Sequence, residues 1–134
     1  MSDYIEAFTH IISKTTNKVY FDSATMNYDE FSKMMIASKH INRLIFNKLT
    51  LHKSGTINFG HGINYRIREL SFQGTGHEDY SFWRSDKTEF DTIIQQLKES
   101  NIHEELETLN VYGCYVDDVK LSGVLVVQEV WPSY

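Results

Sequence analysis

Histidine and acidic side chains are the residues of this sequence that could bind a metal ion or transfer a proton. His77, Glu78 and Asp79 are consecutive, and His61 lies between two glycines. Such donors could form a metal-dependent hydrolase site. However, no pair of them has a recognised ligand spacing on one element, and the sequence lacks a Ser-centred elbow, HExxH, CxxC or P-loop motif. We therefore expect no metal, no cofactor and no enzymatic activity, with the hydrolase as an alternative.

Charge and composition exclude further classes of protein. The chain has 134 residues, with 18 Asp and Glu against 13 Lys and Arg and a net charge of −5. Nucleic-acid binders usually carry the opposite sign, so we expect no nucleic-acid partner. The longest apolar run, Val124–Val127, is too short to span a bilayer, and the start Met1-Ser2-Asp3 is unlike a signal peptide. A single cysteine, Cys114, favours a reducing compartment.

These properties predict one domain over residues 1–134, in the cytoplasm or another intracellular compartment, that buries a sizeable core. Any chemistry or binding then depends on how that domain is built.

Four segments share one spacing of apolar residues, near residues 16–26, 41–51, 67–77 and 106–116. Each has an aliphatic residue at its fourth position and Phe or Val at its sixth. The first two intervals between the starts of successive segments fall within the roughly 20–29 residues that one class of repeat has. The third interval is longer and requires an insertion.

Apolar residues at helical spacing precede three of the segments, at residues 4–12, 28–37 and 90–97. Asn27 or Asp29 is placed to cap the second of these helices. The glycine-rich stretch from His52 to Tyr65, before the third segment, predicts irregular backbone or a single helical turn. The predicted unit is therefore a helix, a short loop, a strand and a turn. The fourth and sixth positions would form a continuous core: Val19, Phe21, Leu44, Phe46, Leu70, Phe72, Leu109 and Val111.

The segment Leu106-x-x-Leu109-x-Val111-x-x-Cys114-x-Val116 resembles the leucine-rich-repeat family, in an irregular and cysteine-containing form. The resemblance extends over roughly residues 4–118. It implies an α/β fold, a short solenoid of about four helix–strand units with a parallel sheet on its concave face. It also implies that Cys114 is a structural residue and that the concave face holds a protein partner.

Strand alternation turns the residues between the core positions toward that concave face. Tyr and Arg are enriched at interface hot spots, and an exposed Ile on a strand indicates a surface that a partner covers. The predicted partner-binding residues are Tyr20, Arg43, Ile45, Glu69, Gln73, Asn110 and Tyr112. The alternative is that such residues simply suit strands and contact nothing.

The insertion after the third segment is a second candidate binding element. It contains the aromatic residues Tyr80, Phe82 and Trp83. An aromatic loop of this kind either binds a partner or folds over the edge of the core, where it would fill the gap beside the irregular third unit.

Residues 119–134 are predicted to cap the C-terminal end of the domain. The run Leu121–Trp131 is apolar on both faces until Gln128, which is typical of a strand buried on two sides. It would lie against the fourth segment and cover the core that a last repeat exposes. Alternatively, its free edge pairs with another chain, and the protein is a structural subunit docked through this strand.

The sequence therefore predicts a non-catalytic protein-binding module or assembly subunit that uses a concave sheet face. Its partner would be a protein, with neither nucleic acid nor membrane involved, and the two could form a hetero-oligomer. Docking through the C-terminal strand and a His/acid hydrolase are the alternatives.

Overall fold

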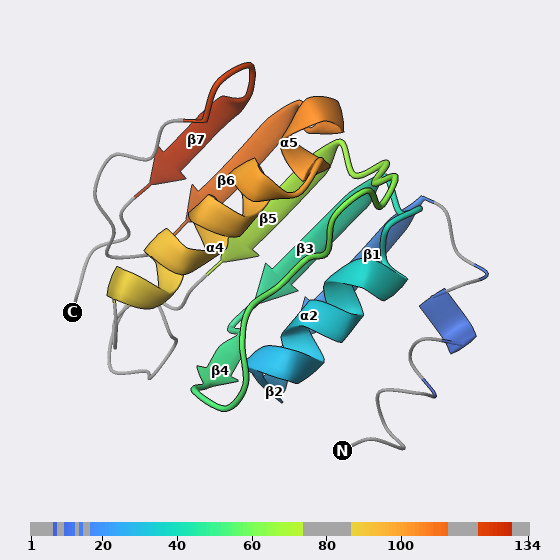
Figure 1. Ribbon diagram of the computed structural model, residues 1–134, viewed down its shortest axis with the longest axis vertical. Coiled ribbons are helices and arrows are strands. Elements are labelled where there is room, and N and C mark those ends of the chain that lie inside the picture. Colours follow the sequence, from blue (N-terminus) through green and yellow to red (C-terminus); the bar gives the residue numbers. More distant parts are fainter. Residues whose placement is uncertain are drawn as a thin grey trace.

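A five-stranded, all-parallel sheet runs through the molecule, and its strands follow one another in chain order (Figure 1). The structure, a computed structural model, describes residues 7, 10–12, 14, 17–73, 87–112 and 121–129. The strands are β1 (Lys18–Asp22), β3 (Arg43–Asn47), β5 (Glu69–Gln73), β6 (Thr108–Tyr112) and β7 (Leu125–Glu129). Two short strands, β2 (Thr25–Asn27) and β4 (Thr50–His52), form a second parallel sheet. The fold is thus α/β, with helices interleaved between the strands.

The helices of the described chain are α2 (Tyr28–Ala37), α4 (Lys87–Glu99) and the single turn α5 (Ile102–Glu105). Figure 1 shows α2 and α4 on the same face of the large sheet. Both were predicted from the apolar spacing and are confirmed, whereas α5 was not predicted. Of the predicted helix at 4–12, residues 7 and 10–12 are helical and the others lie outside the described residues. Within the described ranges, no helix is both long enough and apolar enough to cross a membrane.

A capping box at Asn27 starts α2. The Asn27 Oδ1 accepts a hydrogen bond from the Glu30 backbone N–H at 2.8 Å, and Glu30 Oε1 accepts one from the Asn27 N–H at 2.9 Å. Two backbone donors that the helix itself cannot satisfy are therefore paired. Of the two cap residues that the sequence allowed, the structure selects Asn27. Asp29 instead accepts a hydrogen bond from the Thr56 N–H at 3.0 Å.

The register of the sheet matches the alignment of the four segments. The fourth positions are paired in the order Val19, Leu44, Leu70 and Leu109, and the sixth in the order Phe21, Phe46, Phe72 and Val111. All of these side chains except the half-buried Val19 are buried in the core, as predicted.

The rings at the sixth position are stacked on one another. Phe46 lies between Phe21, at a centroid distance of 5.1 Å, and Phe72, at 5.6 Å, with interplanar angles of 8° and 12°. Phe31 of α2 meets the Phe46 ring edge-on at 5.5 Å. The packing of aromatic rings thus joins three strands to the helix that covers them.

The chain turns in the same way after β1 and after β3. Ser23 and Lys48, which follow the paired residues Asp22 and Asn47, have φ values of 59° and 57°. The Ser23 N–H donates to the Asn47 carbonyl at 2.8 Å, and the Lys48 N–H donates to the Gln73 carbonyl at 2.7 Å. The chain then enters β2 or β4. The sequence predicted a turn here but not the second sheet, because three-residue strands have too few alternations to be recognised.

Residues 53–68 contain neither helix nor strand, as the glycines predicted. Hydrogen bonds within this segment and from it to α4 help to hold it in place. The buried Tyr65 hydroxyl donates to the Phe59 carbonyl at 2.7 Å, and the Phe59 N–H donates to Gln96 Oε1 of α4 at 3.2 Å. Burial raises the pKa of the Tyr65 phenol above its usual value, so the hydroxyl keeps the proton that it donates.

The C-terminal strand lies where the sequence placed it, but it is not buried on both faces. β7 pairs with β6 in parallel, with Leu125 opposite Thr108. However, the Leu125 side chain is 64% exposed, and Val126 and Val127 are only half-buried. The prediction of two-sided burial is wrong because β7 is the last strand of the described sheet and, among the described residues, has a neighbouring strand on one side only. Trp131 lies outside the described residues.

We expect Phe46→Ala to lower the free energy of unfolding by about 3–5 kcal/mol, because it removes the middle ring of the stack and leaves a cavity. Tyr20→Ala, a matched aromatic truncation at an exposed position of the neighbouring strand, should cost less than about 1 kcal/mol. Urea denaturation followed by circular dichroism measures both. Equal losses for the two variants would contradict the core described here.

Candidate functional site

The sheet face turned away from α2 and α4 contains all seven predicted partner-binding residues. We call it the far face, and it carries the first, third and fifth side chains of each strand. Phe46 of β3 and Phe72 of β5 contact Phe31 of α2. Because side chains alternate along a strand, the residues on either side of each of these phenylalanines point toward the far face. The register places Tyr20 beside Ile45, Arg43 beside Glu69, and Gln73 beside Tyr112. Residues from four strands are therefore brought together on one surface.

Two exposed polar contacts on this face join neighbouring strands. Arg43 of β3 donates from Nε at 3.1 Å and from Nη2 at 3.0 Å to the same Glu69 carboxylate oxygen on β5. Asn47 Nδ2 of β3 donates to Asp22 Oδ1 of β1 at 3.0 Å. The Arg43 side chain is 49% exposed and that of Glu69 is 27% exposed. Arg43 and Glu69 are thus presented to solvent as a neutralised pair rather than as two separate charges.

On the inner strands β3, β5 and β6, the middle row of the far face is buried, which contradicts the expectation of an exposed isoleucine. Ile45 is only 6% exposed, and Ser71 and Asn110 are also buried. Ile45 lies in an inner strand, with Tyr20 and Ser71 directly beside it on the two neighbouring strands. The sequence pattern could not reveal this, because the accessibility of a strand residue depends on its neighbours across the sheet.

Asn110 forms a short hydrogen-bonded chain with two other residues of this face. Its Nδ2 donates to Ser71 Oγ at 2.9 Å, and its Oδ1 accepts a hydrogen bond from the Tyr112 hydroxyl at 3.1 Å. Asn110 is 8% exposed, so its amide is occupied within the sheet. It therefore orients the half-buried Tyr112, which lies closer to solvent.

The accessible apolar side chains of the far face lie on its two outer strands, β1 and β7. Tyr20 on β1 is 51% exposed. At the opposite end, Leu125 is 64% exposed and Val127 is half-buried, and the register puts both on the far face beside Thr108 and Asn110. Leu125 and Val127 are not among the binding residues predicted from the sequence. Alignment of the C-terminal strand with residues 108–112 would have identified them.

Several other candidate residues cannot be placed. The insertion residues Tyr80, Phe82 and Trp83 lie outside the described residues, as do His77, Glu78, Asp79 and Cys114. His61 is described and its side chain is exposed. Across the described parts of the chain, no three His, Cys, Asp or Glu side chains come close enough together to hold a metal ion.

The buried and exposed contacts of the far face should differ in strength. Asn110→Ala leaves the buried Ser71 hydroxyl without its donor and should cost about 1–3 kcal/mol of unfolding free energy. Arg43→Ala removes an exposed ion pair and should cost less than about 1 kcal/mol. Chemical denaturation measures both, and a double-mutant cycle of Asn110→Ala with Ser71→Ala isolates the contact. A cycle with no coupling energy would show that the hydrogen bond contributes nothing.

Comparisons of this chain with protein-family models, with curated proteins and with solved structures find no match. The resemblance to leucine-rich repeats therefore depends on the spacing of residues in the sequence. Any function has to be argued from the side chains of the far face and of the surfaces next to it.

Proposed function

We propose that this chain is a non-catalytic protein-binding module whose partner lies on the far face. The observation that carries the proposal is the exposure of Tyr20 on β1, with the half-exposed Arg43 diagonally across from it on β3, on a sheet that hydrogen bonds hold in place. Tyrosine supplies a large contact area with few rotamers to immobilise, and the Arg43 side chain is already oriented by its hydrogen bonds to Glu69. Both features favour binding through this surface. Neither α2 nor α4 covers this face (Figure 1).

We further propose that the architecture is a short leucine-rich-repeat-like solenoid, in which the far face is the concave face. Three observations support this: the strands follow chain order, their register repeats the alignment of the four segments, and the left-handed turn at Ser23 recurs at Lys48. Solenoid proteins typically bind partners across the repeated strands, because each repeat adds one strip to the same surface.

A second candidate function is assembly into a larger complex through β7. The exposed Leu125 lies on the last strand of the sheet, and apolar edge strands recruit further strands. In this case the protein would be a structural subunit, and the far face near Tyr20 would not be needed for binding.

Site-specific photo-crosslinking separates the two functions. A benzophenone amino acid replaces Tyr20, Leu125 or Lys98, the last being an exposed position on α4 that serves as the control. In native cell extract we expect one discrete protein adduct from position 20 and none from position 98. Once mass spectrometry identifies that protein, Tyr20→Ala should weaken its binding by roughly tenfold or more, as for an interface hot spot.

An adduct from position 125 alone would instead support docking through β7. Equal adducts from positions 20 and 98, or unchanged affinity of the Tyr20→Ala variant, would contradict binding on the far face. Circular dichroism of each variant confirms that it is folded.

A further inference from the structure

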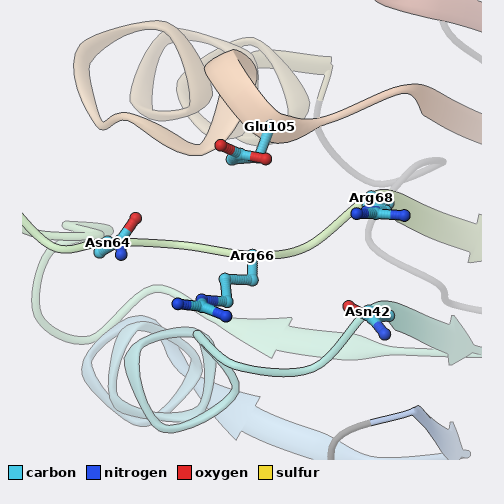
Figure 2. A pocket seen from close by; sticks show the side chains of 5 residues that line it. All are labelled: Asn42, Asn64, Arg66, Arg68 and Glu105. Atoms are coloured by element: carbon cyan, nitrogen blue, oxygen red, sulfur yellow. The ribbon is translucent and has the colours of Figure 1, made fainter.

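A polar pocket lies at the N-terminal ends of the strands. It has a volume of about 310 Å³ and is lined by Asn42, Asn64, Arg66, Arg68 and Glu105. Figure 2 shows the segment with Asn64, Arg66 and Arg68 crossing between Asn42 on one side and Glu105 of α5 on the other. Two guanidinium groups and two amides therefore line one hollow of a chain whose net charge is −5.

The backbone before β5 turns the side chains of Asn64, Arg66 and Arg68 away from the core. Tyr65 and Ile67 are buried, whereas Asn64, Arg66 and Arg68 are exposed, which is the alternation of an extended segment. Backbone hydrogen bonds fix the segment: the Arg66 N–H donates to the Lys39 carbonyl at 2.6 Å, and the Arg68 N–H donates to the Asn42 carbonyl at 2.8 Å. The two arginines are thus held beside the turn that precedes β3.

The described residues neutralise the cations of this pocket only weakly. In the described part of the chain, the Arg66 guanidinium forms no ion pair or hydrogen bond. Arg68 is 3.8 Å from Glu107, and both side chains are largely exposed, so this contact is loose. The Arg66 side chain extends away from Glu105, toward the side of the pocket where Asn42 lies (Figure 2).

We propose that this pocket binds the phosphoryl group of a small phosphate monoester. A guanidinium donates two parallel hydrogen bonds to a phosphate, and two arginines supply the charge that balances a dianion. The Asn42 and Asn64 amides can donate to the remaining oxygens. The volume is at the lower end of the roughly 300–1,000 Å³ of ligand pockets, which suits a small anion. The proposed phosphate site is independent of the proposal that the far face binds a protein.

Glu105 provides a test of the proposal, because its carboxylate lies on the side of the pocket opposite Asn42 and should repel a bound anion. In a titration of the labelled full chain with inorganic phosphate and then phenyl phosphate at constant ionic strength, nuclear magnetic resonance should show saturable shifts at Asn42, Arg66 and Arg68. Arg66→Gln should weaken binding roughly tenfold or more, because it removes charge-assisted hydrogen bonds. Glu105→Gln should tighten it roughly two- to fivefold.

Lys98→Gln is the matched control, since it removes one positive charge from an exposed site on α4. It should leave the affinity for phosphate unchanged, and the amide spectrum of each variant shows whether it is folded. Shifts that grow linearly without saturation would overturn the proposal, as would equal losses of affinity in Arg66→Gln and Lys98→Gln. Either result would indicate non-specific attraction of the anion to surface cations.

Discussion

The stacking of Phe21, Phe46 and Phe72 across three strands is the contact on which the rest of the structure depends. A slip of one residue in any of these strands would turn its ring from the core to the far face. The stack, with the leucines of the neighbouring row, therefore sets the register of the sheet. Phe31 then places α2 on the same apolar surface, so that helix and sheet share one core.

The same register gives the far face a buried, hydrogen-bonded middle on the inner strands and accessible side chains on the outer strands, which form its two ends. In the middle, Asn110 donates a hydrogen bond to Ser71 and accepts one from Tyr112, and Ile45 is sheltered by its neighbours. At the ends, Tyr20 and Leu125 have large accessible areas. Hydrogen bonds to a buried partner stabilise a sheet more than exposed ion pairs do. The middle of the far face therefore stabilises the sheet, whereas the side chains at its ends are accessible to a partner.

The N-terminal edge of the sheet has a different character from the far face. Residues just before the strands contribute Asn42 and Arg68, and both also line a second groove, of about 290 Å³, that includes Arg43 and Glu69. This second groove thus connects the proposed phosphoryl pocket with the far face.

The strands of the large sheet, the register of the first four of them, and α2 with a cap at Asn27 or Asp29 could be predicted from the sequence, because local periodicity and aligned apolar positions encode them. The irregular backbone at 53–68 was likewise evident from its glycines. By contrast, the burial of Ile45 and Asn110, the exposure of Leu125 and the pocket at Arg66 are properties of the tertiary structure alone. Accessibility and pocket shape depend on which strands become neighbours, and those neighbours are distant in the chain.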